Sequence, residues 1–415
     1  MRAEWRYLAM IGLLSSGLTI GWLFATIAYA ALGYDHYRLR LPLLGDLALI
    51  GLLNSAPVLA GGISGPFVWY VVRRWGPRLP LFAGCLLHAI ALLSLMGAPP
   101  ASALTPISAW TLLGGIAASG PASVLINLAG PPFMMQLSGA HGPDRLFSRS
   151  AALSLIIGGV GNLLGGFLTT GWRFLLATTD PLTPYRWNAG LSMLMVAFAG
   201  LPLIGLHPSP VVTTVPASTS PVVQLRALWR ALVGGLPFTI APFLLSLGAA
   251  LFIPYLGLFF RRQFEAPDPT IGLIFALINL STGLATLAGP RLAALIGRMP
   301  GVVLTQALAI PCLIALAFAP SLPVAAVIAI IRGALMNMAA PLFDAQALSK
   351  TAADQHATVI ALIRAAASAG YITGPTISAE MQNAGGFGLI FLTAALCYTA
   401  AVFANAIIFI WRRYD

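Results

Sequence analysis

Long apolar segments separated by short polar stretches run along the whole chain. Twelve of them are long enough to cross a bilayer as helices, because about 20 apolar residues span its hydrocarbon core of about 30 Å. The predicted spans are residues 7–33, 46–72, 79–97, 107–136, 147–176, 186–206, 229–260, 270–296, 301–320, 322–348, 356–380 and 387–411. Strands of a membrane barrel would instead alternate polar and apolar residues. The pattern therefore predicts an all-α polytopic membrane protein with twelve transmembrane helices.

Composition supports this class of protein. Hydrophobic residues make up 59% of the chain and charged residues 8%, with a mean hydropathy of +0.89, which is too much apolar surface for one soluble core. The net charge of +11 does not indicate nucleic-acid binding, since the basic residues are dispersed at the ends of apolar segments. Cys85, Cys312 and Cys397 lie inside apolar segments without metal-ligand spacing. We expect them to be core residues and expect no metal or cofactor.

The chain contains an internal duplication. Four identical residues recur at a common offset of 210 residues: Asn127, Pro131, Gln136 and Asp144 in the first copy match Asn337, Pro341, Gln346 and Asp354 in the second. Shorter matches keep the same order in both halves, such as residues 13–17 with residues 244–248 at an offset of 231. Such spacing is not expected from composition alone. We therefore expect two equivalent six-helix bundles, residues 1–206 and 229–415.

The segment between the bundles, residues 207–228, is rich in Pro, Ser and Thr and predicts a cytoplasmic linker. If the N-terminus lies inside, fourteen basic residues fall in inner loops and six in outer loops. This asymmetry predicts that both termini face the cytoplasm. The first apolar segment is too long for a signal-peptide core, so we expect it to be retained. The excess of Arg over Lys is typical of a GC-rich bacterial genome, and the inner membrane is the expected location.

Twelve predicted helices, a six-plus-six duplication, a central linker and basic loops between helices 2–3 and 8–9 together resemble the major facilitator superfamily (MFS). That family's loop 2–3 signature is Gly, three residues, Asp-Arg, any residue, Gly and then basic residues. Arg74, Gly76 and Arg78 fit it, whereas Arg73 occupies the acidic position. In the second copy Arg298 fits. The resemblance implies a gating role for Arg74 and Arg298, and implies that helices 1, 4, 7 and 10 line a central cavity.

Helix 5 carries a second partial match to the same superfamily. Its exporters often have Gly-Pro-x-x-Gly-Gly in this helix, and here Asn162 replaces the Pro between Gly161 and the pair Gly165-Gly166. The match favours export. The alternative is that these glycines only let two helices approach closely.

Asn127 and Asn337 are candidate substrate-binding residues. The resemblance places them on cavity helices 4 and 10, and an amide in hydrocarbon needs a partner such as water or substrate. A hydrogen bond to an adjoining helix is the alternative for each. Pro131 and Pro341 follow four residues later and each removes a backbone N–H. We expect them to bend or loosen the two helices during gating.

Charged residues inside the predicted spans are costly and therefore informative. Arg332, in the outer half of helix 10, is a candidate for binding an anionic substrate, and snorkelling toward the headgroups is its alternative. Asp344 follows Asn337 by two helical turns, on the same face. We expect an ion pair between Asp344 and Arg364 of helix 11, which could be structural, a cytoplasmic gate or a proton carrier.

Aromatic residues gather in the outer parts of helices 1 and 7. Phe24, Tyr29 and Tyr255 are candidates for an apolar cavity wall that binds a lipophilic solute. At the offset of 231 residues Phe24 pairs with Tyr255. The alternative is a membrane-interface belt.

The leading hypothesis is a secondary transporter that moves a small lipophilic or amphipathic molecule by alternating access, with export and proton antiport preferred. The runner-up is an uptake permease or facilitator for a sugar or organic anion, and the remote alternative is a membrane sensor on the same scaffold. No phosphate-binding loop of the type used by ATPases is present. The five histidines are scattered, so we do not expect an enzyme. We expect a monomer whose partners are the small-molecule substrate, the lipid bilayer and protons.

Overall fold

The computed structural model describes residues 2–42, 45–138, 143–206, 235–352 and 355–411. They form two compact units. The first takes in the described part of residues 1–212 together with Tyr255–Leu280, and the second takes in the described part of residues 213–254 together with the chain from Ser281 onward. The predicted linker 207–228 lies outside the described residues, and the division into bundles 1–206 and 229–415 stays a prediction.

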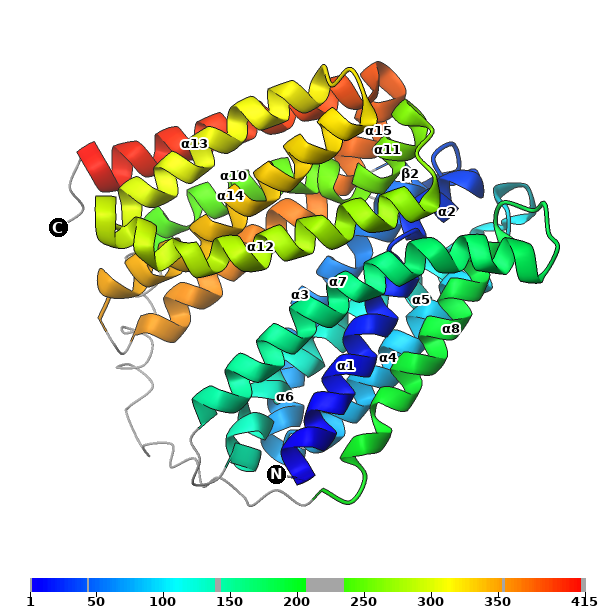
Figure 1. Ribbon diagram of the computed structural model, residues 1–415, viewed down its shortest axis with the longest axis horizontal. Coiled ribbons are helices and arrows are strands. Elements are labelled where there is room, and N and C mark those ends of the chain that lie inside the picture. Colours follow the sequence, from blue (N-terminus) through cyan, green and yellow to red (C-terminus); the bar gives the residue numbers. More distant parts are fainter. Residues whose placement is uncertain (1, 43–44, 139–142, 207–234, 353–354, 412–415) are drawn as a thin grey trace. The chain divides into compact units, whose positions relative to one another are not determined.

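The first half of the chain is almost entirely helical (Figure 1). Its helices are α1 (Arg2–Trp22), α2 (Ala25–Ala31), α3 (Leu49–Trp75), α4 (Arg78–Met96), α5 (Pro106–Ala117), α6 (Ser119–Ser138), α7 (Pro143–Leu175) and α8 (Thr183–Ala199), with 3₁₀ turns η1 (Ala101–Ala103) and η3 (Leu201–Leu203). The first and fourth predicted spans are each divided into two helices, α1 with α2 and α5 with α6. The predicted spans 46–72, 79–97, 147–176 and 186–206 correspond to α3, α4, α7 and α8.

The second half of the chain is also almost entirely helical. Its elements are η4 (Leu236–Phe238), α10 (Ile240–Phe252), η5 (Ile253–Tyr255), α11 (Leu256–Phe264), α12 (Asp268–Ile296), α13 (Arg298–Ala317), α14 (Leu322–Ser349), α15 (His356–Asn405) and the π-helix η7 (Ala406–Trp411). The seventh predicted span is divided at η5. Within α15, Gly386 has a non-helical backbone with φ 66° and ψ −166°, so α15 consists of two helices that meet there. These two helices correspond to the last two predicted spans.

The two helix breaks near the start of each half support the duplication. Phe24 is the N-cap residue of α2, with φ −106° and ψ 9°. Tyr255 is the N-cap residue of α11, with φ −104° and ψ 2°. The sequence offset of 231 pairs these two residues. Both occupy the N-cap position of a short helix, and their φ and ψ angles are nearly the same.

Ten described segments are long and apolar enough to cross a membrane. One of them, Thr358–Phe409, covers two predicted spans, and α8 has 17 residues and is just shorter than the shortest of the ten. The count is consistent with twelve helices. The boundary predicted at residue 46 was wrong: strands β1 (Arg38–Leu41) and β2 (Gly45–Ala48) form an antiparallel hairpin, and α3 begins at Leu49.

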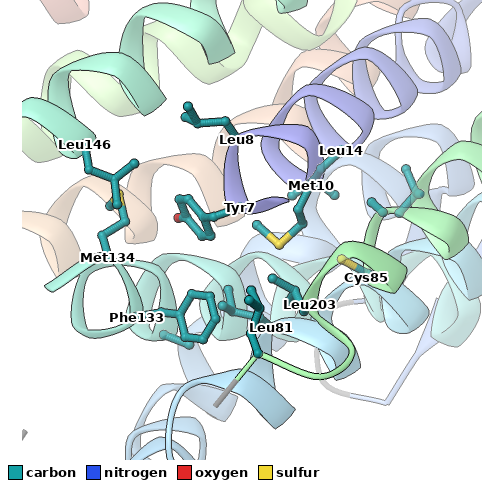
Figure 2. Close-up of a cluster of buried hydrophobic side chains, with 14 of the residues drawn as sticks. Tyr7, Leu8, Met10, Leu14, Leu81, Cys85, Phe133, Met134, Leu146 and Leu203 are labelled. Carbon is teal, nitrogen blue, oxygen red and sulfur yellow. The ribbon is translucent and has the colours of Figure 1, made fainter. Parts of the chain in front are cut away.

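The core of the first unit contains buried side chains from α1, α4, α6, α7, α8 and η3. Figure 2 shows Tyr7 and Met10 of α1, Phe133 of α6 and Leu203 of η3 within this cluster. The ring centroids of Tyr7 and Phe133 are 5.7 Å apart. Cys85 is fully buried in this cluster, as expected from its apolar segment, whereas Cys312 and Cys397 are partly exposed. In the second unit, buried side chains from η4, α13, α14 and α15 pack around Phe238 and Phe343.

Candidate functional site

Arg332 of α14 is buried in the second unit, with 7% of its surface exposed. The carbon at the centre of its guanidinium lies 4.6 Å from the ring centroid of Phe252, on α10, and 5.4 Å from that of Tyr398, on α15. Its Nη2 also donates a hydrogen bond to the Tyr398 hydroxyl. Aromatic rings attract a cation through the negative charge of their faces, by about 2 kcal/mol or more when water is excluded. Three helices therefore hold this guanidinium.

No acidic side chain pairs with Arg332 among the residues that the structure describes, and its Nε has no hydrogen-bond partner there. A buried cation compensated only by rings and a phenol oxygen can still bind an anion, because guanidinium groups present N–H donors that match carboxylate and phosphate geometry. The two rings beside it offer apolar contact area. The arrangement suits a molecule that has both an acidic group and an apolar body.

Asn337 lies farther along α14, on its exposed surface. Its side-chain amide donates hydrogen bonds to the Gly333 carbonyl at 2.8 Å and to the Thr282 hydroxyl of α12 at 3.3 Å. The helix–helix hydrogen bond that the sequence left open is therefore present at Asn337. Its counterpart in the first copy, Asn127, is exposed on α6.

Pro131 and Pro341 are both exposed, and both lie inside continuous helices, α6 and α14. Each helix continues for at least one further turn beyond its proline. The predicted role of these prolines in gating stays a prediction.

The ion pair expected between Asp344 of α14 and Arg364 of α15 is present. The Asp344 side chain is 25% exposed and that of Arg364 is 61% exposed. Water therefore reaches both partners, and such a pair contributes at most about 1 kcal/mol to stability. A proton can reach the carboxylate from solvent without a large rearrangement.

Arg74 and Arg298, the predicted gating arginines, lie at equivalent helix junctions. Arg74 is exposed in the last turn of α3, just before Gly76, which has φ 72°. Arg298 is exposed at the start of α13, just after Gly297, which has φ 91°. Glycine is favoured at both positions because other residues rarely adopt positive φ. Each loop thus contains a glycine with positive φ, which lets the chain reverse direction between two helices.

The three predicted aromatic residues are buried in the first unit. Phe24, Tyr29 and Tyr255 are each at most 2% exposed. Phe24 stacks on Tyr185 with ring centroids 5.4 Å apart, and Tyr29 stacks on Tyr34 at 6.1 Å. In this conformation the rings pack against protein, so a solute could reach them only after the surrounding helices separate.

A buried carboxylate that the sequence reasoning missed lies at the start of α12. Asp268 is 3% exposed. It pairs with Arg261 in the last turn of α11 and accepts a 3.1 Å hydrogen bond from the Tyr185 hydroxyl at the start of α8. It also lies 3.6 Å from the Arg173 guanidinium in the last turn of α7. We call these four residues the Asp268 cluster. Its sequence signal was weak, because both arginines resemble ordinary loop charges.

Hydrogen bonds of two residues, Asn188 and Asp180, order the α7–α8 junction beside this cluster. Buried Asn188 of α8 donates to the Gly165 carbonyl at 3.0 Å and accepts from the Trp172 indole N–H at 2.9 Å. Just before α8, the Asp180 carboxylate accepts hydrogen bonds from the backbone N–H groups of Leu182 and Thr183 and from the Thr183 hydroxyl. The ends of α7 and α8 are therefore fixed to each other.

Residues 238–415 match a family model described as Major Facilitator Superfamily. A search of curated proteins gave no significant match. Among solved structures, the nucleoside transporter NupG superposes with a TM-score of 0.73 and 16% identity, covering 98% of this chain and 100% of that chain.

Two other solved structures are similar over a comparable length. A bacterial homologue of the human lysosomal transporter Spinster, in an inward-facing and unoccupied conformation, has a TM-score of 0.69 and 14% identity, covering 100% of this chain and 97% of that one. A D-xylose–proton symporter has a TM-score of 0.69 and 16% identity, covering 97% and 96%. The chain is therefore an MFS-fold membrane protein, and its resemblance to the major facilitator superfamily is confirmed.

Proposed function

We propose that this protein is a secondary transporter that moves a small amphipathic or lipophilic solute across the membrane by alternating access. The fold supports transport, since the similar structures include a nucleoside transporter and a D-xylose–proton symporter. The divided helices α1–α2, α5–α6 and α10–α11 also support it, because broken helices are frequent around the binding sites of transporters. We prefer export, driven by proton antiport, because the glycines of α7 partly match the sequence that exporters of the superfamily often have in this helix.

The observation that carries the substrate class is the environment of Arg332. Its guanidinium lies between the rings of Phe252 and Tyr398 and has no acidic partner among the described residues. Leaving a charge buried without a counter-ion is costly. A solute with one acidic group would supply that counter-ion, and its apolar part would contact the rings. We therefore propose an amphipathic organic anion as the substrate.

The remaining predicted residues take roles around this site. Asn127, Asn337, Phe24, Tyr29 and Tyr255 would line the solute path in other conformations of the cycle. Asp344 would carry the proton, with Arg364 as its partner when it is ionised. The protein would lie in the bacterial inner membrane as a monomer with both termini in the cytoplasm.

The test is transport by the purified protein in proteoliposomes with an imposed pH gradient. The panel contains amphipathic carboxylates, their neutral amides and sugars. We expect flux of the carboxylates and at least about tenfold less flux of the amides, since removing an interaction of about 1.4 kcal/mol changes an equilibrium tenfold. Arg332→Ala should abolish this preference for the acid.

Two control variants identify the role of each charge. Arg291→Gln, at an exposed position of α12, controls for the loss of one positive charge and should keep the preference. Asp46→Asn in the exposed hairpin is the control for Asp344→Asn, which should lose the response to the pH gradient. Absence of flux for the whole panel in folded protein, or an unchanged acid preference in Arg332→Ala, would reject the proposal.

A further inference from the structure

Asp268 connects parts of the chain that belong to different copies of the duplication. It lies at the start of α12 and its neighbour Arg261 is on α11, both in the second copy. Its other neighbours, Arg173 and Tyr185, are on α7 and α8 in the first copy. One buried carboxylate therefore joins the α11–α12 segment to the end of α7 and the beginning of α8.

The backbones of α7 and α12 touch beside this cluster. A Cβ atom added to Gly166 would lie 2.6 Å from the Asp268 carbonyl oxygen, and one added to Gly272 would lie 2.6 Å from the carbonyl oxygen of Asn162. Both distances are far below van der Waals contact. Gly166 of α7 and Gly272 of α12 thus allow the first two turns of α12 to lie directly on α7.

A second ion pair acts on the same segment. Arg262 of α11 pairs with Asp35, which follows α2, at 2.6 Å. Beneath it α11 packs on α2, since a Cβ added to Gly257 would lie 3.7 Å from the Ile27 side chain. The side chains of Arg262 and Asp35 are 42% and 11% exposed, whereas those of Arg261 and Asp268 are 28% and 2% exposed. The buried contact is therefore the stronger of the two, because surface pairs are screened by water.

We propose that Asp268 is a gating residue, whose carboxylate holds the two copies together at the α7–α8 end of the protein and releases them when this end opens. The proposal rests on the proposed transport cycle, in which the two copies must separate alternately at each end. With both termini in the cytoplasm, this end faces outward. At this end the two copies are joined by a close helix contact and by one buried anion with two cationic partners. Partial separation would lose the helix contact and the ion pairs together, so this end is either closed or open.

The test measures how fast a cysteine beneath this contact is labelled. Ile27→Cys is introduced after Cys85, Cys312 and Cys397 have been replaced by Ala, and the full chain is reconstituted in proteoliposomes. Ile27 is 6% exposed and packs under α11, so labelling by a membrane-impermeant maleimide should be slow. In Asp268→Asn it should be at least about tenfold faster, since breaking a buried charge pair shifts equilibria by more than one decade.

Further variants separate gating from loss of structure. Asp268→Glu keeps the negative charge and should restore labelling to within about threefold of the parent, whereas Arg173→Gln, at a half-exposed position, should give a smaller increase than Asp268→Asn. Asp46→Asn removes an exposed carboxylate in strand β2 and should leave the labelling rate unchanged. Thermal unfolding of each variant checks that it is folded.

The labelling result is independent of the substrate, so it can fail separately from the proposed function. Equal labelling of the parent, Asp268→Asn and Arg173→Gln in folded protein would overturn the gating role of Asp268, whether or not the protein transports the carboxylates. Faster labelling in Asp268→Asn without flux of any solute would support the gate and count against the proposed substrate.

Discussion

Gly120 is the position where we expect a single methyl group to have the largest effect on stability. It is buried near the start of α6, where this helix crosses α3. A Cβ atom added there would lie 1.8 Å from the Pro57 carbonyl oxygen and 2.7 Å from the Gly61 amide nitrogen. These are backbone atoms four residues apart on α3, so the methyl group would enter a hydrogen-bonded turn. No side-chain rotation can relieve the overlap.

The magnitude follows from two opposing effects. Overpacking of a core costs about 1–3 kcal/mol, and we take the upper end because backbone must move. Replacing Gly by Ala in a helix gains about 1 kcal/mol in helix propensity. We therefore expect Gly120→Ala to lose about 2 kcal/mol, which corresponds to a decrease in Tm of roughly 4–8 °C for a unit of this size.

The matched control is Gly114→Ala on α5. This glycine is exposed and an added Cβ would meet no atom within 4 Å, so the propensity gain of up to about 1 kcal/mol should remain. Apparent Tm values of both variants are compared in the same detergent at one heating rate, because membrane proteins often unfold irreversibly. A Tm for Gly120→Ala equal to or above that of Gly114→Ala would refute the close backbone contact between α3 and α6.

Three further predictions concern individual polar contacts. The Thr183 hydroxyl and backbone N–H groups lower the pKa of Asp180, so the stability it adds is present above the usual aspartate pKa and is lost as pH falls through the lowered pKa. Asp180→Ala should therefore cost about 0.5–1 kcal/mol at pH 7 and progressively less in melts at lower pH. Asn188→Ala leaves the partly buried Trp172 indole N–H without its acceptor, so it should cost about 1–2 kcal/mol, seen as a lower Tm than in Trp172→Phe/Asn188→Ala. Arg364→Ala should change stability by less than about 1 kcal/mol in the same assay, because the guanidinium is mostly exposed.

Features that depend on local sequence could be predicted well. Apolar segments fixed the approximate position of each helix, since lipid leaves few alternatives for the backbone. The repeat offset also identified structurally equivalent residues. It paired Phe24 with Tyr255, and both are N-cap residues of short helices. The hairpin at residues 38–48 was missed, because Leu47 and Ala48 are apolar and continue smoothly into α3. Hydropathy does not distinguish a short strand from the first turn of a helix.

The contacts of the candidate site could not be predicted in the same way. The sequence indicated that Arg332 is unusual for a membrane span, but not that Phe252 and Tyr398 lie beside it, since they come from other helices. Asp268 was overlooked for a related reason: its contact Arg173 is far away in the sequence. Only the packing of the helices turns these separate charges into a group.

The two carboxylates, Asp268 and Asp344, should differ in transport because their partners differ. The Asp268 side chain is 2% exposed and lies beside two guanidinium groups, those of Arg261 and Arg173. The Asp344 side chain is 25% exposed, and its partner Arg364 is 61% exposed. Water therefore reaches Asp344, which suits a proton carrier, whereas Asp268 is better suited to hold a closed conformation. We expect Asp344→Asn to lose proton-coupled accumulation while downhill solute exchange continues, and Asp268→Asn to keep coupling with a raised leak. Proton-to-solute stoichiometry measured in proteoliposomes distinguishes them, and loss of coupling in Asp268→Asn with normal coupling in Asp344→Asn would reverse the two roles.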